Sequence, residues 1–219
     1  MNILRPDNLT FPDHRAANRE GLLALGGDLS VPRLLLAYKS GIFPWTDDPL
    51  TWWSPDPRAI FDIETFRPPR RLESKLRHHP FEITVNRDFE GVIHGCSEPA
   101  PGRESTWISP RFVEAYTELH RQGYAHSVEV WQGRELAGGI YGVAIAGFFA
   151  GESMFHRATD ASKIALCFLM DHLRARRFEL FDTQVLSPLT ARLGAIEIRR
   201  RDYLGRLASA LRKPVRFLD

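Results

Sequence analysis

Cysteine is scarce in this chain, and patterns that would indicate metal, disulfide or membrane chemistry are missing. The 219 residues include 2 cysteines, Cys96 and Cys167, which belong to no CxxC or Cys/His cluster. We therefore expect neither a metal site nor a disulfide framework, and the low thiol content suits a reducing compartment. No apolar run of about 18 residues occurs, and the first ten residues lack the apolar core of a signal peptide. These absences predict a cytoplasmic protein that does not enter a membrane.

Glycine-rich phosphate loops are missing as well. Neither GxxxxGK[ST] nor GxGxxG occurs, so nothing supports nucleotide hydrolysis or dinucleotide binding. The formal net charge is only +2, so the local distribution of basic residues must decide whether nucleic acid is a partner. The chain does have 43% hydrophobic residues, enough for one large domain, alone or with a small one.

The first sixty residues are rich in turn-forming and aromatic residues. One helix is expected there, with Ser30 as its cap, Pro32 in its first turn and Gly41 at its end. The remainder of this region reads as irregular. We therefore predict a small N-terminal domain over residues 1–62.

From residue 63 onward, helical and strand patterns alternate. Helices are expected at 70–78, 89–96, 110–122, 161–174 and 188–193, with caps at Ser109 and Asp160 and a last helix capped by Asp202. Strands are expected at 81–85, 126–131, 136–145, 148–154, 178–185 and 196–198. A meander followed by helix, strand, helix and strand predicts an α+β domain with a mixed sheet over residues 63–219. By analogy, this order is compatible with an acetyltransferase-like (GNAT-type) sheet.

Glu152 lies at the end of an apolar strand, in the sequence Gly-Glu-Ser-Met-Phe. A buried glutamate is costly without a partner or a function, which makes it a candidate site residue. The alternative interpretation is a solvated strand end, and the sequence leaves both open. Ser153 does not indicate a serine hydrolase, because the nucleophile-elbow motif needs a glycine where Phe155 stands.

Asp182 and Gln184 lie two residues apart on an expected strand, so both should point to one face of the sheet. A carboxylate beside an amide can form a hydrogen-bond relay suited to an amine that loses protons as it attacks. A purely structural polar pair at a sheet end remains the alternative.

Aromatic and basic residues gather in separate segments. Tryptophans at 45, 52, 53 and 107 could stack on a nucleobase, although core packing is the usual role of tryptophan. The expected helix at 70–78 is basic and suits contact with a phosphate backbone, although a solvated face would look the same.

Ten segments together resemble the bacterial leucyl/phenylalanyl-tRNA–protein transferase family, in the family's order and over nearly the whole chain. They are GLLALGGDLS (21–30), AYKSGIFPW (37–45), WWSPDPRA (52–59), TWISP (106–110), AYTELHRQGYAHSVEVW (115–131), GGIYGVA (138–144), FAGESMF (149–155), ASKIAL (161–166), DTQ (182–184) and LGA (193–195). Any one of these segments is weak evidence, whereas ten in order are specific.

The resemblance implies a small N-terminal domain and an acetyltransferase-like C-terminal domain. It also implies transfer of Leu or Phe, and less readily Met, from leucyl-tRNA or phenylalanyl-tRNA to proteins with N-terminal Arg or Lys. In the family this marks proteins for N-end-rule degradation. No cofactor is expected, because the tRNA ester is already activated. A monomer is the default expectation.

The resemblance further implies site residues. Asp182, Gln184 and Glu152 match the family's catalytic positions. A pocket for the aminoacyl group and terminal adenosine is implied for Trp45, Trp107, Phe149, Gly151, Ser153, Met154, Leu166 and Leu169. The tRNA-binding positions are Arg70, Arg71, Lys75 and Arg77. We expect Gln184 to orient the acceptor amine, Asp182 to polarise Gln184, and Glu152 to position polar groups or favour a cationic acceptor.

Three positions depart from the family pattern. Leu189 stands where the family has His, Arg192 replaces a Ser, and Thr183 replaces the Cys of the D-C-Q segment.

Two other functions remain to be weighed. An acyl-CoA-dependent N-acyltransferase would need a glycine-containing pyrophosphate loop, and residues 156–160 contain no glycine. A non-catalytic RNA-binding module would explain the basic helix but not the Asp182–Gln184 pair.

Overall fold

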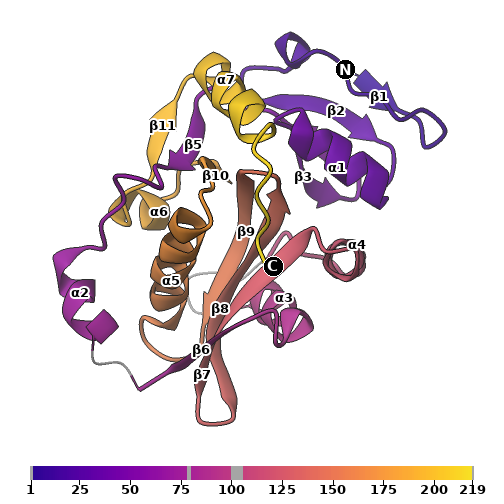
Figure 1. Cartoon of the computed structure of the whole chain (residues 1–219). Coiled ribbons are helices and arrows are strands. Elements are labelled where there is room, and N and C mark those ends of the chain that lie inside the picture. Colours follow the sequence, from indigo (N-terminus) through magenta and orange to yellow (C-terminus); the bar gives the residue numbers. More distant parts are fainter. Residues whose placement is uncertain (1, 78–79, 100–105, 219) are drawn as a thin grey trace.

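The computed structural model describes residues 2–77, 80–99 and 106–218 and contains two β-sheets (Figure 1). The smaller sheet has the strand order β1-β2-β4-β3. Its strands are β1 (Asn2–Leu4), β2 (Leu22–Gly26), β3 (Phe43–Asp47) and β4 (Leu50–Trp53). The expectation of an irregular N-terminal region is therefore wrong. Strands of three to five residues that contain glycine and proline give too short an alternation to be recognised.

Two helical segments accompany this sheet, namely η1 (His14–Ala16) and α1 (Val31–Lys39). The second is the helix expected from the sequence. Ser30 is its N-cap residue, but the Ser30 side chain makes no capping hydrogen bond. Just beyond the helix, Gly41 has a φ of 70°, which favours glycine. A Cβ atom there would lie 2.7 Å from Leu204 Cδ2, so the glycine also permits close approach of the last helix.

The larger sheet has the order β11-β5-β10-β9-β8-β7-β6. Its strands are β5 (Arg58–Phe61), β6 (Glu82–Val85), β7 (Ala125–Gln132), β8 (Glu135–Ile145), β9 (Phe148–His156), β10 (Leu180–Gln184) and β11 (Ile196–Ile198). Strands β9 and β10 pair in parallel, whereas the other neighbours pair antiparallel. The predicted α+β class with a mixed sheet is thus confirmed, as is the meander of β7, β8 and β9.

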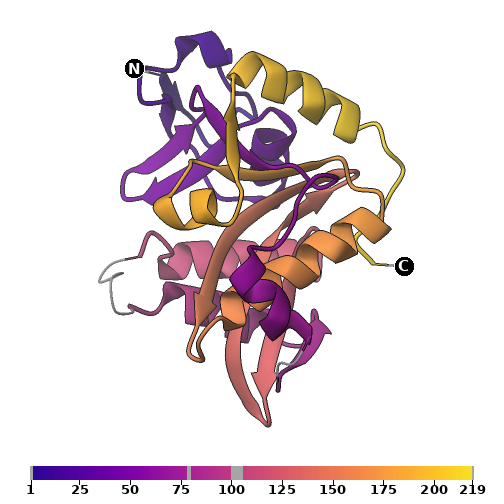
Figure 2. The same cartoon turned by 90° about the vertical axis from the view of Figure 1, so that its left-hand side faces the viewer.

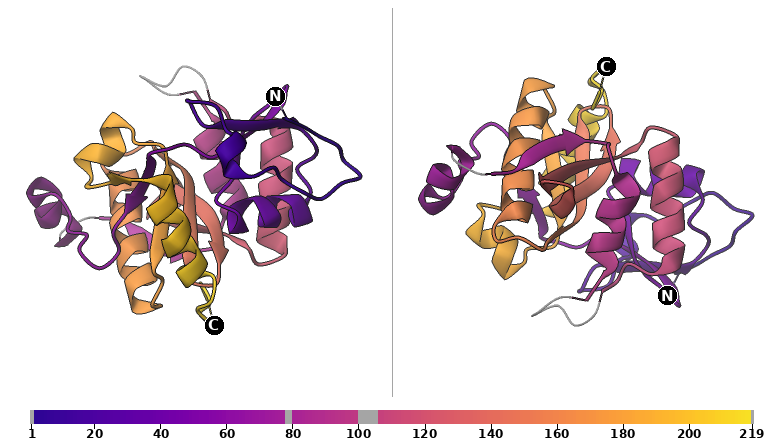
Figure 3. Two further views of the ribbon diagram at one scale, coloured as in Figure 1. Left: turned by 90° about the horizontal axis from the view of Figure 1, so that it is seen from above. Right: turned by 90° about the horizontal axis from the view of Figure 1, so that it is seen from below.

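Helices cover both faces of the larger sheet (Figure 3). They are α2 (Arg70–Arg77), α3 (Phe89–Ser97), α4 (Pro110–Arg121), α5 (Ala161–Ala175), α6 (Pro188–Arg192) and α7 (Arg200–Ala210). Helix α5 lies on one side of the strands, and α3 and α4 lie on the other. Helix α7 lies across the top of the molecule beside the N-terminal sheet (Figure 2). Each expected helix is present.

Two predicted caps are wrong. Asp160 precedes α5 but makes no side-chain capping bond, and its carboxylate forms ion pairs with Lys75 and Lys163 instead. Helix α7 begins at Arg200 with Arg199 as its N-cap residue. Asp202 therefore lies inside the first turn, where its charge favours the helix dipole without capping it.

The core has two parts, one on each face of the larger sheet. Side chains of β8 alternate between them, with Tyr141 and Val143 on the α3–α4 side and Ile140 and Ala144 on the α5 side. The first part continues without a break into the N-terminal sheet, where Trp52 is fully buried. Strands buried on both faces explain the long apolar runs in this part of the sequence.

Strands β9 and β10 run together only briefly. Their register spans the pairs from Leu180–Phe148 to Asp182–Ala150. Beyond these pairs the strands separate, so that Glu152 and Gln184 lie near one another past the last pair. This separation creates room for a site at the middle of the sheet.

The division of the chain at residue 62 stays a prediction. Strands β1 to β4 end at Trp53, and β5 at residues 58–61 already belongs to the larger sheet. Within the described ranges, no helix is long and apolar enough to cross a lipid bilayer.

Candidate active site

Glu152 is the centre of a buried hydrogen-bond network that joins four elements. The hydroxyl of Tyr38 on α1 lies 2.8 Å from Glu152 Oε1, and that of Tyr116 on α4 lies 3.0 Å from Oε2. The two hydroxyl oxygens are 2.5 Å apart, which closes a ring of three groups. Gln184 Nε2 on β10 donates to Glu152 Oε1 over 3.2 Å.

The number of protons available distinguishes the two charge states of this ring. Three contacts join Glu152, Tyr38 and Tyr116, and each contact needs one proton. An ionised Glu152 leaves only the two tyrosine protons, because a carboxylate only accepts hydrogen bonds. A protonated Glu152 supplies the third proton. The ring is therefore complete when Glu152 carries a proton and one proton short when it does not.

The pKa of Glu152 is raised to about 7. Burial is the largest cause, and the hydrogen bonds from Tyr38 and Tyr116 act against it. Burial also raises the pKa of both tyrosines well above 10, followed by the effect of the Glu152 charge. Near neutral pH, Glu152 is thus the member of the network that gains and loses a proton.

Asp182 lies behind this network, fully buried and held by four hydrogen bonds. Arg58 on β5 donates from Nε to Oδ1 over 2.8 Å and from Nη2 to Oδ2 over 2.6 Å. The Tyr203 hydroxyl adds a bond of 2.9 Å to Oδ2. The fourth donor is the backbone N–H of Gln184, 2.9 Å from Oδ1. Such a saturated carboxylate has little capacity left for a substrate.

Arg58 is itself held rigidly. Its guanidinium lies between the rings of Phe43 and Tyr203, with its Cζ 4.7 and 4.5 Å from their centroids. Its Nη1 donates to the Gly41 carbonyl over 3.1 Å. The Arg58–Asp182 pair therefore connects the N-terminal sheet, α7 and strand β10.

Gln184 does not continue the regular strand. The pairing of β10 with β5 shifts between Asp182 and Gln184, and Gln184 has a φ of 58°, rare for a residue other than glycine. The regular alternation that placed both side chains on one face is thus absent. Asp182 faces Arg58, while the Gln184 side chain faces Glu152. In the described part of the chain, no hydrogen bond joins the Asp182 carboxylate to the Gln184 side-chain amide.

Two cavities meet at Glu152 and Thr183, which line both. The first, the aromatic cavity, measures about 140 Å³ and has walls from Phe43, Pro44, Trp45, Trp107, Gln184 and Val185. The second, the apolar cavity, measures about 90 Å³. Its walls include Phe61, Ile140, Met154, Leu166 and Phe181, and its rim includes Gly151, Ser153 and Thr190. A Cβ on Gly151 would lie 2.5 Å from the Phe181 ring, so this glycine lets the ring close the wall.

Most of the pocket residues implied by the resemblance line these cavities. Trp45 and Trp107 line the aromatic cavity, and Gly151, Ser153, Met154 and Leu166 line the apolar one. Phe149 and Leu169 line neither, because each is 1% exposed within the core on the α5 side.

The basic residues of α2 lie away from both cavities. Arg70, Arg71 and Lys75 are exposed, and the side chain of Arg77 lies outside the described part of the structure.

Several residues of the site were missed from the sequence. Tyr38 and Tyr116 were counted as apolar helix faces, yet a buried tyrosine hydroxyl needs a partner, which was the available signal. Arg58, Phe61, Ile140 and Phe181 gave no local signal.

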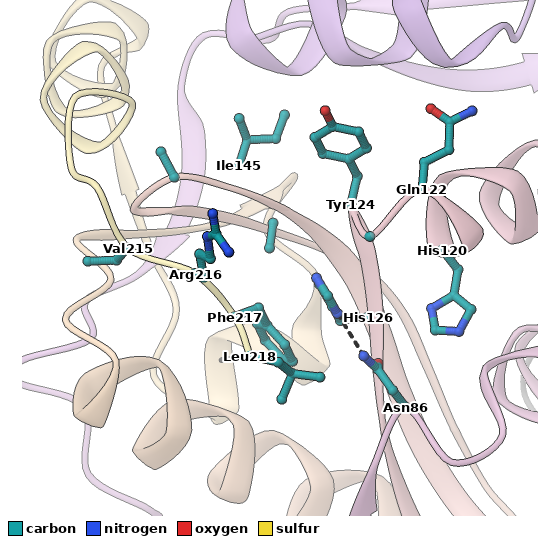
Figure 4. A pocket seen from close by; sticks show the side chains of 13 residues that line it. Asn86, His120, Gln122, Tyr124, His126, Ile145, Val215, Arg216, Phe217 and Leu218 are labelled. Atoms are coloured by element: carbon teal, nitrogen blue, oxygen red, sulfur yellow. Dashed lines mark hydrogen bonds between the residues drawn. The ribbon is translucent and has the colours of Figure 1, made fainter.

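A larger cavity, of about 600 Å³, lies between the start of β7, the β8–β9 turn and the C-terminal segment (Figure 4). There Asn86 Nδ2 and His126 Nδ1 are 2.9 Å apart, and the His126 ring stacks on Phe217. None of the predicted site residues lines this cavity. Among the residues with a described placement, no group of three His, Cys, Asp or Glu side chains is arranged to hold a metal ion.

Comparison with known sequences decides the family. The sequence model for leucyl/phenylalanyl-tRNA protein transferase matches residues 60–208, and the model for that family's N-terminal domain matches residues 27–56. The chain belongs to the leucyl/phenylalanyl-tRNA protein transferase family. The predicted class of enzyme, an aminoacyltransferase, is thereby confirmed.

Individual relatives carry the same name. A leucyl/phenylalanyl-tRNA–protein transferase of Shewanella halifaxensis is 51% identical over 216 residues, covering 97% of this chain and 91% of the relative. Another from Anaeromyxobacter dehalogenans is 48% identical over 218 residues, covering 98% and 94%.

Solved structures resemble the chain more remotely. L-PGS from Bacillus licheniformis has a TM-score of 0.41 at 14% identity, covering 74% of this chain and 54% of that one. A GCN5-related N-acetyltransferase from Sphaerobacter thermophilus also scores 0.41 at 14% identity, covering 84% and 60%. Similarity this low carries no argument about the site.

Proposed function

We propose that this chain transfers Leu or Phe, and less readily Met, from charged tRNA to the α-amine of another protein. The acceptors begin with Arg or Lys, and the added residue marks them for degradation in the cytoplasm. The family supports aminoacyl transfer, and the names of the relatives support the donor. The observation that carries the chemistry is a buried Glu152, one proton short when ionised, at the junction of two cavities.

The two cavities suit the two ends of an aminoacyl-adenosine. The apolar cavity takes the Leu or Phe side chain, and a wall of Met154 and Ile140 adapts to either shape. Trp45 and Trp107 stack on the terminal adenine, a contact that contributes roughly 1–3 kcal/mol per base. The ester carbonyl then lies beside Glu152 and Thr183, which belong to both cavities.

Transfer forms one C–N bond and breaks one C–O bond. The acceptor amine attacks the ester carbonyl, and the proton it loses passes to ionised Glu152, completing the ring with Tyr38 and Tyr116. Glu152 then returns this proton to the ribose oxygen as the ester bond breaks. A pKa of about 7 suits both steps, because a general base works best when its pKa is near the working pH.

Gln184 and Asp182 have different roles in this scheme. Gln184 Nε2 is engaged with Glu152, so its carbonyl oxygen is available to orient the attacking amine. Asp182 acts as a positioning residue, because it contacts Gln184 through the backbone N–H and holds the bulge in place. This replaces the simpler idea that Asp182 polarises the Gln184 amide directly.

Transfer of labelled leucine from leucyl-tRNA to an acceptor protein tests the proposal. Label should enter an acceptor that begins with Arg and not the same acceptor beginning with Gly. Binding of the tRNA without transfer would instead support an RNA-binding module. Transfer from acetyl-CoA in place of leucyl-tRNA would support an acyl-CoA-dependent N-acyltransferase.

A further inference from the structure

A groove of about 510 Å³ lies between helix α2, the start of α5 and helix α6. In Figure 1 these three helices occupy the same side of the molecule, and in Figure 2 α2 passes in front of α5. Four cationic side chains line the groove, Arg71, Lys75, Lys163 and Arg192, against one acidic side chain, Asp160. The groove is therefore strongly positive on a chain whose formal net charge is only +2.

Asp160 fixes two of these cations in place. Its Oδ1 lies 2.5 Å from Lys163 Nζ, and its Oδ2 forms an ion pair with Lys75. The Asp160 side chain is 10% exposed, so the two ammonium groups, from α5 and α2, are held from below. One negative charge between two positive ones leaves an excess of one.

The other two cations are free. Within residues 2–77, 80–99 and 106–218, neither Arg71 nor Arg192 takes part in a hydrogen bond or ion pair. Both side chains are exposed at the groove. Guanidinium groups without partners suit bidentate contact with phosphate oxygens, whereas the lysines contribute point charges.

The groove adjoins the apolar cavity. Helix α5 contributes Lys163 to the groove and Leu166 to the cavity, and residues three apart on a helix are neighbours on one face. Helix α6 likewise contributes Arg192 to the groove and Thr190 to the cavity. A ligand whose end fills the cavities at Glu152 therefore lies close to these cations.

We propose that this groove binds the phosphodiester backbone of the donor tRNA near its aminoacylated end, with Lys163 and Arg192 contributing together with Arg71 and Lys75 of α2. The inference rests on the proposed function. It adds a contact surface on α5 and α6 to the basic helix, and it includes Arg192, one of the positions where this chain departs from its family. Phosphate contacts carry no base information, so leucyl-tRNA and phenylalanyl-tRNA should depend on the groove equally.

Charge reversal with two donors tests the groove. Arg192→Glu and Arg71→Glu are compared with Arg134→Glu, an exposed arginine in the β7–β8 turn outside the groove. Each groove variant should raise the KM for leucyl-tRNA at least about tenfold. Each should also reduce the slope of log KM against log salt by about one, as expected for one lost phosphate contact. The control should change neither quantity.

The second donor is leucyl-adenosine, which fills the cavities but has no tRNA backbone. Its KM should be unchanged in all three variants, and this also shows that they fold. Wild-type KM and salt slope for leucyl-tRNA in both groove variants would overturn the inference, as would an equal loss with both donors. An increase in the KM of the acceptor protein alone would assign the groove to that protein instead. Failure of the wild-type chain to transfer from either donor would refute the proposed function itself.

Discussion

Removal of the Asp182 carboxylate should cost stability as well as activity, because Asp182 is the counter-charge of a buried arginine. In an Asp182→Ala variant, Arg58 keeps its charge at 1% side-chain exposure without an ion-pair partner. The Tyr203 hydroxyl and the Gln184 N–H also lose their acceptor. Breaking a buried pair from one side typically costs about 3–5 kcal/mol. Since a whole domain is stable by only about 5–15 kcal/mol, such a loss is readily measured.

The assay is urea unfolding alongside single-turnover transfer from leucyl-tRNA. Asp182→Ala should lower the free energy of unfolding by about 3–5 kcal/mol. An Arg58→Met/Asp182→Leu double variant should recover most of that loss, because replacing both members of a buried pair with apolar side chains is often neutral. The double variant should still transfer slowly, since the bulge at Gln184 has lost the acceptor of its N–H. An Asp182→Ala chain as stable as wild type but inactive would refute the positioning role and indicate direct participation in the chemistry.

Two further predictions concern Glu152 and the apolar cavity. Glu152 has a pKa of about 7 when folded against 4.5 as its ordinary value, so the folded state binds the proton more tightly. Its contribution to stability is full below pH 4.5 and is lost as pH rises through 7. Glu152→Gln, which cannot ionise, should therefore gain up to about 3 kcal/mol over wild type between pH 5 and pH 8; identical pH dependence of urea unfolding in both proteins would contradict this. Met154→Ala enlarges the apolar cavity and should shift the kcat/KM ratio toward phenylalanyl-tRNA by about tenfold. An unchanged ratio would mean that the donor side chain binds elsewhere.

The sequence predicted the parts of the fold that have long patterns. Strands β7 to β9 and helices α4 and α5 bury apolar side chains over eight residues or more, so their periodicity is clear. The N-terminal sheet was missed because its strands are short, and Gly26 and Pro44 interrupt the pattern. Its stability comes from packing of residues such as Trp52 into a core shared with the larger sheet, which no local window reveals.

The site shows a similar limit. Glu152, Asp182 and Gln184 were selected as candidates because polar residues at the ends of buried strands need partners. The partners themselves came from distant segments, with Tyr38 lying 114 residues from Glu152 and Arg58 lying 124 from Asp182. Strand periodicity also predicted an Asp182–Gln184 relay that the bulge at Gln184 replaces with a backbone contact. A single sequence does not encode such a bulge in any recognisable pattern.

The most direct test of the central claim, that Glu152 exchanges the proton during transfer, is the ratio of single-turnover rates of wild type and Glu152→Gln as a function of pH. Taking the ratio cancels titration of the acceptor amine, whose pKa of about 7.7–8.0 would otherwise obscure the result. The account predicts a ratio that rises with pH, has its midpoint near 7 and reaches a plateau of about 10²–10⁴. A ratio that stays constant from pH 5.5 to pH 9 would contradict it.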